Sequence, residues 1–310
     1  MSASDATVKV GGPNWSRAGR SVMNWWFKPV PLARAAVFRL FVYGFIPLDV
    51  VVLRPWGAAH DYVDPALYAP LQIGRLLPLP TPTSTFVIVI RTTVVVAAIV
   101  LVLLVLTNRM PKLQTILGWV AAFGYLEWMV ISFSYGKVDH DRFSFLVALF
   151  VLPTIGRAAL RDQTPSQSAG WALRNVQIAI VATYFLAACA KVRFGGWGWV
   201  NSATILRAVV RRGTFLADPL MDQPWTLQFT QWFIVIIEFA SPILLFVRER
   251  WQYLIVAGLV IFHIMTFAMI TIIFLPHVLC MLSFLPLERL VPRWRSSQTH
   301  SVDPQPQPSV

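Results

Sequence analysis

Several ionisable side chains interrupt the apolar segments of this 310-residue chain, and their types could carry chemistry. A charged group inside a membrane costs about 2.5–3.5 kcal/mol to insert and usually faces the protein interior. A lysine removed from water becomes a usable base, and histidines can relay the proton that it takes. We therefore expect a proton-handling or ligand-binding site built from these groups. They are Arg39, Asp49, Arg91, Glu127, Lys191, Glu238, His263 and His277.

The order of the apolar segments brings many of these groups to one end of the molecule. Lys191 closes one segment, and the loop VDHD at 138–141 precedes another. His263 and His277 lie about equally far from the turn that joins the last two segments, and His60 adds a further histidine at this end. We predict Lys191 and His140 as catalytic residues. The predicted binding residues are Asp49, Asp139, Asp141, Trp197, Trp199, Glu238, His263 and His277.

Each of these groups also has a purely structural interpretation. A lysine at the end of an apolar segment is typical of a side chain that anchors a helix at the membrane surface. Glu238 could pair with Arg39 or Arg91 to hold helices together, and His263 could bond a neighbouring helix. The histidines show no spacing that is diagnostic of a metal site, so we predict no metal.

The composition indicates a membrane protein. The chain is 56% hydrophobic and 13% charged, with a mean hydropathy of +0.62, whereas a soluble domain is roughly 25% charged. Helices that face lipid need no polar outer surface, so the low charged fraction fits a protein embedded in a bilayer. The net charge of +12 comes from basic residues between and beside the apolar runs, where they contact lipid head groups, so nucleic acid is not an expected partner.

Seven or eight apolar stretches are long enough to predict spans, because a helix needs about 20 mostly apolar residues to cross a membrane. The expected fold is an all-α polytopic bundle, in which Pro276 breaks the final helix or makes it re-entrant. Residues 201–212 predict a short amphipathic helix on the outer surface. We divide the chain into an interfacial segment (1–30), a transmembrane domain (31–290) and a disordered tail (291–310). The expected spans are 35–53, 85–107, 113–134, 143–160, 171–191, 227–247, 252–271 and 272–289.

The basic residues of alternate loops fall on one side of this arrangement, as the positive-inside rule requires of the cytoplasmic side. Both termini are therefore expected in the cytoplasm, although the outer connection at 192–226 is also basic. Arginine outnumbers lysine by 21 to 5, a bias of GC-rich bacterial genomes, so we expect a bacterial cell membrane.

Five segments carry the charged residues in an order similar to that of a known family. Together they resemble the transmembrane core of vitamin K-dependent γ-carboxylase and its bacterial relatives, the horizontally transferred transmembrane (HTTM) domain. The segments are PLARAAVFRLFVYGFIPLD (31–49), YGKVDHDRFSFLVALFVL (135–152), YFLAACAKVRFGGWGWVNS (184–202), IIEFASPILLFVRER (236–250) and HIMTFAMITIIFLPHVLCMLSFLPLERL (263–290).

This resemblance implies that Lys191 deprotonates a reduced quinone and that His140 corresponds to the histidine of the family's loop. The carboxylase carries a large luminal domain after its spans, whereas this chain ends about 20 residues after its last expected helix. Carboxylation of protein glutamates is therefore not expected.

Three classes of function follow from these observations. The leading hypothesis is an enzyme that acts on a lipid-soluble small molecule such as a quinol. The first alternative is a non-catalytic membrane subunit or scaffold. The second, less favoured, is a transporter, because transporters are often built from inverted repeats and the sequence displays none. The sequence contains no Gly-rich phosphate loop and no GxSxG, CxxC or HExxH motif that would indicate another reaction, and it does not indicate a protein partner.

Overall fold

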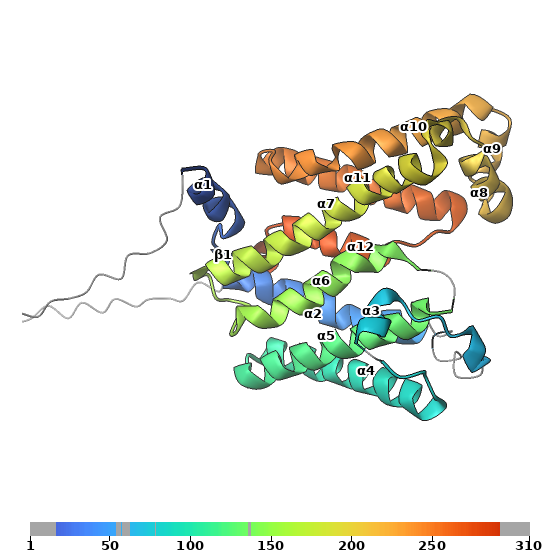
Figure 1. Cartoon of the computed structure of the whole chain (residues 1–310). Helices are drawn as coiled ribbons and strands as arrows, with labels where there is room; N and C mark the ends of the chain where they lie inside the picture. The colour runs from blue at the N-terminus through green and yellow to red at the C-terminus, as the bar shows by residue number, and fades with distance from the viewer. Residues whose placement is uncertain (1–16, 54–56, 58–62, 78, 136–137, 292–310) are drawn as a thin grey trace, which may run out of the picture.

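The computed structural model describes residues 17–53, 57, 63–77, 79–135 and 138–291 (Figure 1). His60 and nearly all of the predicted tail lie outside this part of the chain. The described residues form a helix bundle whose only sheet pairs β1 (Val30–Pro31) with β2 (Pro165–Ser166), antiparallel. The predicted all-α polytopic fold is confirmed.

Six helical stretches of 22–29 residues are long and apolar enough to cross a membrane. Each corresponds to one of the expected spans. Two of them combine an α-helix with a differently wound last turn. They are α2 (Leu32–Pro47) with η1 (Leu48–Leu53), α4 (Ser84–Thr107), α5 (Pro111–Phe133), α7 (Gln167–Gly195), α10 (Pro224–Ala240) with η7 (Ser241–Leu245), and α11 (Glu249–Ile270).

The other two expected spans are shorter than predicted. The stretch 143–160 holds α6 (Phe143–Val151) and η5 (Leu152–Ile155), and it ends at Gly156, whose φ of 73° only glycine adopts readily. The stretch 272–289 holds α12 (Leu275–Cys280) and η8 (Met281–Phe284). Pro276 lies in the first turn of α12, so it begins this helix instead of breaking it. The two short helices pack against each other.

Local sequence signals explain where the long helices begin and end. The Thr83 side chain accepts a hydrogen bond from the Phe86 amide at the start of α4, and Ser166 does the same for α7. Asn108 ends α4 in the left-handed conformation. Pro47 precedes the π-helical turn η1, which places Asp49 at the fully buried side of the bundle.

Shorter elements close the two ends of the bundle. One end holds α1 (Arg17–Trp26), the β1–β2 pair and η9 (Leu287–Leu290). The opposite end holds α3 (Gln72–Leu76), α8 (Thr204–Arg212) and α9 (Asp218–Met221) (Figure 1). The α8 helix confirms the amphipathic helix expected within 201–212. The remaining elements are η3 (Pro65–Leu67), η4 (His140–Arg142) and η6 (Trp197–Asn201).

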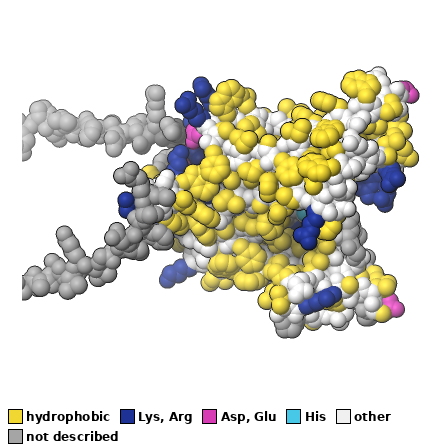
Figure 2. Space-filling model, turned by 45° about the horizontal axis from the view of Figure 1, so that its top comes forward, with side chains coloured by type: hydrophobic (Ala, Val, Ile, Leu, Met, Phe, Trp, Pro, Cys, Tyr) yellow, Lys and Arg dark blue, Asp and Glu magenta, His cyan; other side chains and the backbone are white. Residues whose placement is uncertain are grey.

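A buried core joins α2, α4, α5, α6 and α7 around Phe38, Tyr125, Trp128 and Phe145. Outward-facing side chains of the long helices are also apolar. Ile88, Leu103 and Leu254, for example, are each more than half exposed. In Figure 2 hydrophobic side chains cover the middle of the visible face, and most charged side chains lie toward its two ends. This distribution fits helices that face lipid.

Candidate functional site

A cavity of about 390 Å³, here called the central cavity, lies between α7, α10, α11 and the segment from Ile272 to His277. Most of its wall is apolar. Seven of the ten predicted site residues line the cavity beside Tyr184 and several threonines, and the fold brings them together across sequence separations of more than 100 residues. These residues are His140, Asp141, Lys191, Trp199, Glu238, His263 and His277.

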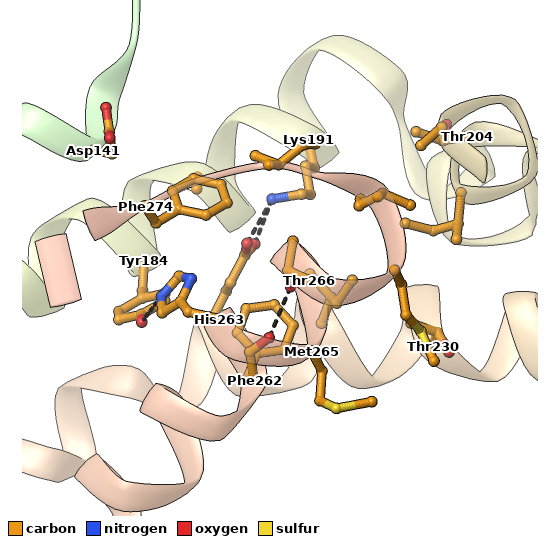
Figure 3. Close-up of a pocket in the computed structure, with 18 of the residues that line it drawn as sticks. Asp141, Tyr184, Lys191, Thr204, Thr230, Phe262, His263, Met265, Thr266 and Phe274 are labelled. Atoms are coloured by element: carbon orange, nitrogen blue, oxygen red, sulfur yellow. Dashed lines mark hydrogen bonds and ion pairs between the residues drawn. The ribbon is translucent and has the colours of Figure 1, made fainter. Parts of the chain in front are cut away.

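Lys191 forms an ion pair with Glu238 in the wall of the central cavity. Its Nζ donates to both carboxylate oxygens of Glu238, each at 2.7 Å, and it lies 5.4 Å from the centre of the Trp199 ring. Figure 3 shows the Lys191 side chain reaching into the same space as His263 and Phe274. The suggested pairing of Glu238 with Arg39 or Arg91 is wrong. Arg39 donates to the carbonyl oxygens of Leu152 and Gly156 instead.

Tyr184, His263 and His277 form an aromatic and polar cluster deeper in the cavity. The Tyr184 hydroxyl lies 2.6 Å from Nε2 of His263, and the Tyr184 and His277 rings are 4.8 Å apart. His277 Nδ1 is 3.3 Å from the Ser144 hydroxyl. Within the described part of the chain, Nδ1 of His263 and Nε2 of His277 have no hydrogen-bond partner. Two buried imidazole nitrogens of the cavity wall therefore have unused hydrogen-bonding capacity.

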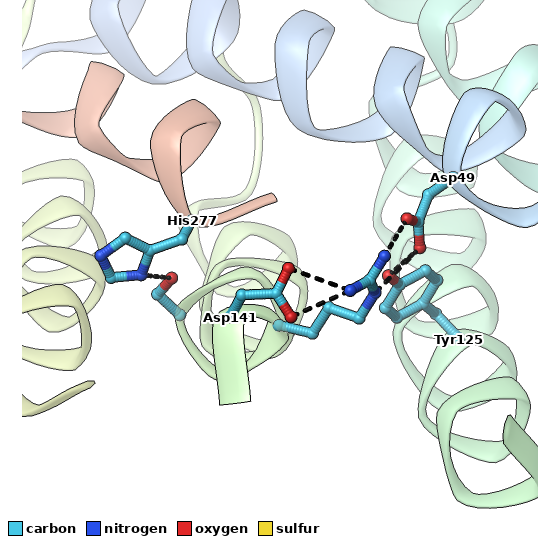
Figure 4. Close-up of polar contacts among 6 residues, drawn as sticks. Asp49, Tyr125, Asp141 and His277 are labelled. Carbon is cyan, nitrogen blue, oxygen red and sulfur yellow. Dashed lines mark hydrogen bonds and ion pairs between the residues drawn. The ribbon is translucent and has the colours of Figure 1, made fainter. Parts of the chain in front are cut away.

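A second polar cluster adjoins the cavity and holds two of the predicted acidic residues. Arg142 donates to Asp49 at 2.6 Å and to both oxygens of Asp141 at 2.9 and 3.0 Å (Figure 4). Tyr125 donates to Asp49 at 2.6 Å. Asp49 therefore neutralises a buried arginine and does not line the central cavity. Asp141 contacts both regions, because it also lines the cavity wall.

His140 lies where three hollows meet. Besides the central cavity, it lines a more polar hollow of about 410 Å³, here called the vestibule, with Asp139, Arg212 and Thr271. It also lines an apolar groove of about 950 Å³ between α5, α6 and α7, here called the lateral groove. Lys191 belongs to the central cavity and to the lateral groove. The two predicted catalytic residues thus share the boundary between these two hollows.

The roof of the central cavity is the α8 region, which buried Gln231 holds in place. The Gln231 side chain accepts from the Ile205 amide and donates to the carbonyls of Trp199, Val200 and Ser202. Thr214 bonds to the end of α11 through Ala268 and Met269. This roof sets which of the two predicted tryptophans faces the cavity. Trp199 lines it, whereas Trp197 is 63% exposed.

Sequence reasoning did not single out Tyr184, Arg142 or Gln231. Tyr184 lies seven residues before Lys191, two helical turns on the same face of α7, so the spacing could have identified it. Arg142 directly follows Asp141, but its partner Asp49 is 93 residues away, and nothing in the sequence signals that contact. Gln231 acts on backbone groups, which leave no pattern in the sequence.

Comparison with known proteins does not place this chain in a family, since no family model, curated protein or solved structure matches it. The likeness to the γ-carboxylase core stays a prediction. Among the described residues, no group of three or more His, Cys, Asp or Glu side chains is arranged to hold a metal ion.

Proposed function

We propose that this integral membrane protein is an enzyme that deprotonates a lipid-soluble substrate, such as a reduced quinone, with Lys191 as the base. The Lys191–Glu238 ion pair at the boundary of an apolar cavity and a lateral groove carries the proposal. An apolar ring or chain would be held by the walls, and a polar head would meet the few polar groups that converge there.

The ion pair can act as one proton-accepting unit. A substrate O–H bond breaks, and its proton joins the pair, which then consists of the Lys191 ammonium and a protonated Glu238 carboxyl. The Lys191 proton first crosses the 2.7 Å hydrogen bond to Glu238, and the resulting neutral amine takes the proton of the substrate. The substrate is left as an oxyanion, which the ammonium and an imidazole N–H from His263 or His277 stabilise.

The lateral groove supplies a route for such a substrate. Its lining from α5, α6 and α7 is mostly apolar, and Thr183 and Ala187 line both the groove and the central cavity. The short helix α6 contributes to the groove floor. A molecule dissolved in the bilayer would reach Lys191 from the side without crossing water.

Native mass spectrometry of the purified protein in lipid nanodiscs with a reduced naphthoquinone tests the substrate class. We expect a bound quinol in the wild type and a loss of roughly tenfold or more in Lys191→Ala, as for a lost charge-assisted hydrogen bond. Lys112→Ala, which removes an exposed lysine from the other end of the bundle, is the control. No quinol on the wild type would exclude this substrate and favour the non-catalytic subunit.

A further inference from the structure

A separate pocket of about 360 Å³ opens at the end of the bundle opposite α8, far from Lys191. We call it the basic pocket. The segment 28–31 and the starts of α2, α7 and α11 surround it, together with η8. Gly170 of α7 lets this segment approach closely, because a Cβ there would lie 1.9 Å from the Lys28 carbonyl oxygen. This close contact fixes the position of the segment 28–31 against α7 and so shapes one wall of the pocket.

Positive charge dominates the wall of the basic pocket. Four basic side chains line it against the single carboxylate of Glu249. Arg34 is neutralised by two hydrogen bonds to Glu288, but no ion pair joins Lys28, Arg174 or Arg248 to a carboxylate of the described residues. The starts of α7 and α11 add the positive ends of two helix dipoles. The pocket therefore has the electrostatics of an anion site.

Two buried polar atoms in the same wall lack a partner. Ser283 is 1% exposed, and its Oγ has no hydrogen-bond partner in the described part of the chain. The Oε1 atom of Gln177 is likewise unpartnered, although its Nε2 donates to the Ser283 carbonyl at 2.8 Å. An unsatisfied buried hydroxyl is costly, and a ligand that accepts its proton removes that cost.

Aromatic side chains flank these polar groups. The Arg174 guanidinium lies 4.5 Å from the centre of the Trp25 ring, and Trp25 stacks on Phe246 at 5.6 Å. Phe246 is 73% exposed, so the pocket continues into an apolar outer surface. This combination of basic groups inside and aromatic groups at the mouth suits a head group at the membrane surface whose acyl chains follow the adjacent helices.

We propose that the basic pocket binds a phosphate ester, presented either by an anionic glycerophospholipid or by a small soluble phosphate ester. Lys28, Arg174 and Arg248 neutralise the phosphate, and the Ser283 hydroxyl donates to one of its oxygens. The Gln177 carbonyl accepts from a hydroxyl on the ligand, such as one from a glycerol head group. The site is independent of the central cavity and of the reaction proposed there.

Native mass spectrometry in nanodiscs of equal phosphatidylglycerol and phosphatidylcholine content tests the lipid source. We expect phosphatidylglycerol to be retained preferentially by the wild type. Arg174→Gln should reduce this retention roughly tenfold, and Ser283→Ala, which changes no charge, should also reduce it. Arg109→Gln removes an exposed arginine at the same end of the bundle but outside the pocket, and it should retain the lipid as the wild type does.

A second measurement covers the soluble source and a variant that fails to fold. Thermal unfolding of delipidated protein with glycerol 3-phosphate should show stabilisation of the wild type and of Arg109→Gln, but not of Lys28→Gln, which changes an exposed side chain. Stabilisation without a lipid preference would assign the site to a soluble ester. Absence of both effects, or equal losses in Arg174→Gln and Arg109→Gln, would overturn the proposal.

Discussion

At the residue scale, the ion-paired charges in and beside the central cavity form two groups with different partners. Lys191 and Glu238 pair with each other beside open space, so their charges remain available to a ligand. Arg142 instead contacts Asp49 and Asp141 on both sides and is 6% exposed. The first group lies in a cavity wall, and the second is enclosed by the bundle.

Removing Arg142 should be more damaging than removing one of its partners. Arg142→Gln leaves two buried carboxylates without their cation, and breaking a buried pair in this way costs about 3–5 kcal/mol. Asp49→Asn leaves Arg142 bound to Asp141 and should cost about 1–2 kcal/mol. Thermal or denaturant unfolding in detergent measures both, with Arg109→Gln as the exposed control. A smaller loss in Arg142→Gln than in Asp49→Asn would contradict this assignment.

At the scale of elements, two kinds of helix build the site. The long helices α7, α10 and α11 supply the walls of the central cavity. The segment from Ile272 to His277, which includes the first turn of the short helix α12, lines its inner side. The α8 helix closes the cavity, but it is only nine residues long and depends on Gln231 for its position. An isolated helix of this length is marginal in water, so its hydrogen bonds to the bundle determine whether the roof is formed.

Gln231→Leu should therefore loosen the roof while the bundle remains folded. Four backbone groups around α8 lose their partner, each at a cost of about 1–3 kcal/mol if it stays buried, and local opening avoids that cost. Hydrogen–deuterium exchange should accelerate in residues 199–212 with little change in the core of α2 and α5. Ile236→Leu on the same helix, where the side chain is exposed, should leave exchange unchanged. Global unfolding of Gln231→Leu would argue against a locally closed roof.

At the scale of the whole molecule, the ion pair between Arg34 and Glu288 joins the first long helix to the last described turn, across 254 residues. Burial alone would raise the pKa of Glu288, but hydrogen bonds and charge from Arg34 outweigh it and hold this pKa below its ordinary value. A lowered folded-state pKa means that the pair stabilises the protein above the unfolded-state pKa and that this contribution is lost as the pH falls through the folded-state pKa.

Acidification should consequently destabilise the folded protein, because protonated Glu288 no longer forms an ion pair with Arg34. The wild type should lose thermal stability on going from about pH 7 to below about pH 4, the region where an ordinary glutamate titrates. Glu288→Gln should be less stable than the wild type at neutral pH and should lose less on acidification. Equal pH dependence of the two proteins would show that this ion pair does not contribute to the pH response.

The sequence predicts the class and course of the fold better than it predicts the lengths of two helices. Apolar runs identify the six long spans, because each must be covered by lipid or by neighbouring helices. The runs containing α6 and α12 are just as apolar, but Gly156 and the Leu285–Pro286 step end their helices early. Hydropathy averages over such local signals, so it overestimates both lengths.

Which residues come together in the central cavity could largely be predicted, because the position of a residue along a span gives its depth in the membrane. Counting residues from the turns places Lys191, His263 and His277 at one end, and the structure brings all three to one cavity. Partner choice was not predictable in the same way. The contacts of Glu238 with Lys191 and of Asp49 with Arg142 depend on how the helices rotate and pack, which span depth alone does not determine.

If the Lys191–Glu238 pair takes a proton from a lipid-soluble substrate through the lysine amine, then Lys191→Arg should slow that proton transfer. Arginine keeps the charge and can pair with Glu238, but it does not release its proton in proteins. The measurement is anaerobic stopped-flow ultraviolet spectroscopy of a reduced naphthoquinone binding to the protein in nanodiscs, with occupancy checked by native mass spectrometry. We predict that the quinolate anion forms at least roughly tenfold more slowly on Lys191→Arg than on the wild type at equal occupancy, because arginine cannot pass its proton to Glu238 and then accept that of the substrate. Equal rates of anion formation on both proteins would contradict the role of Lys191 as the base.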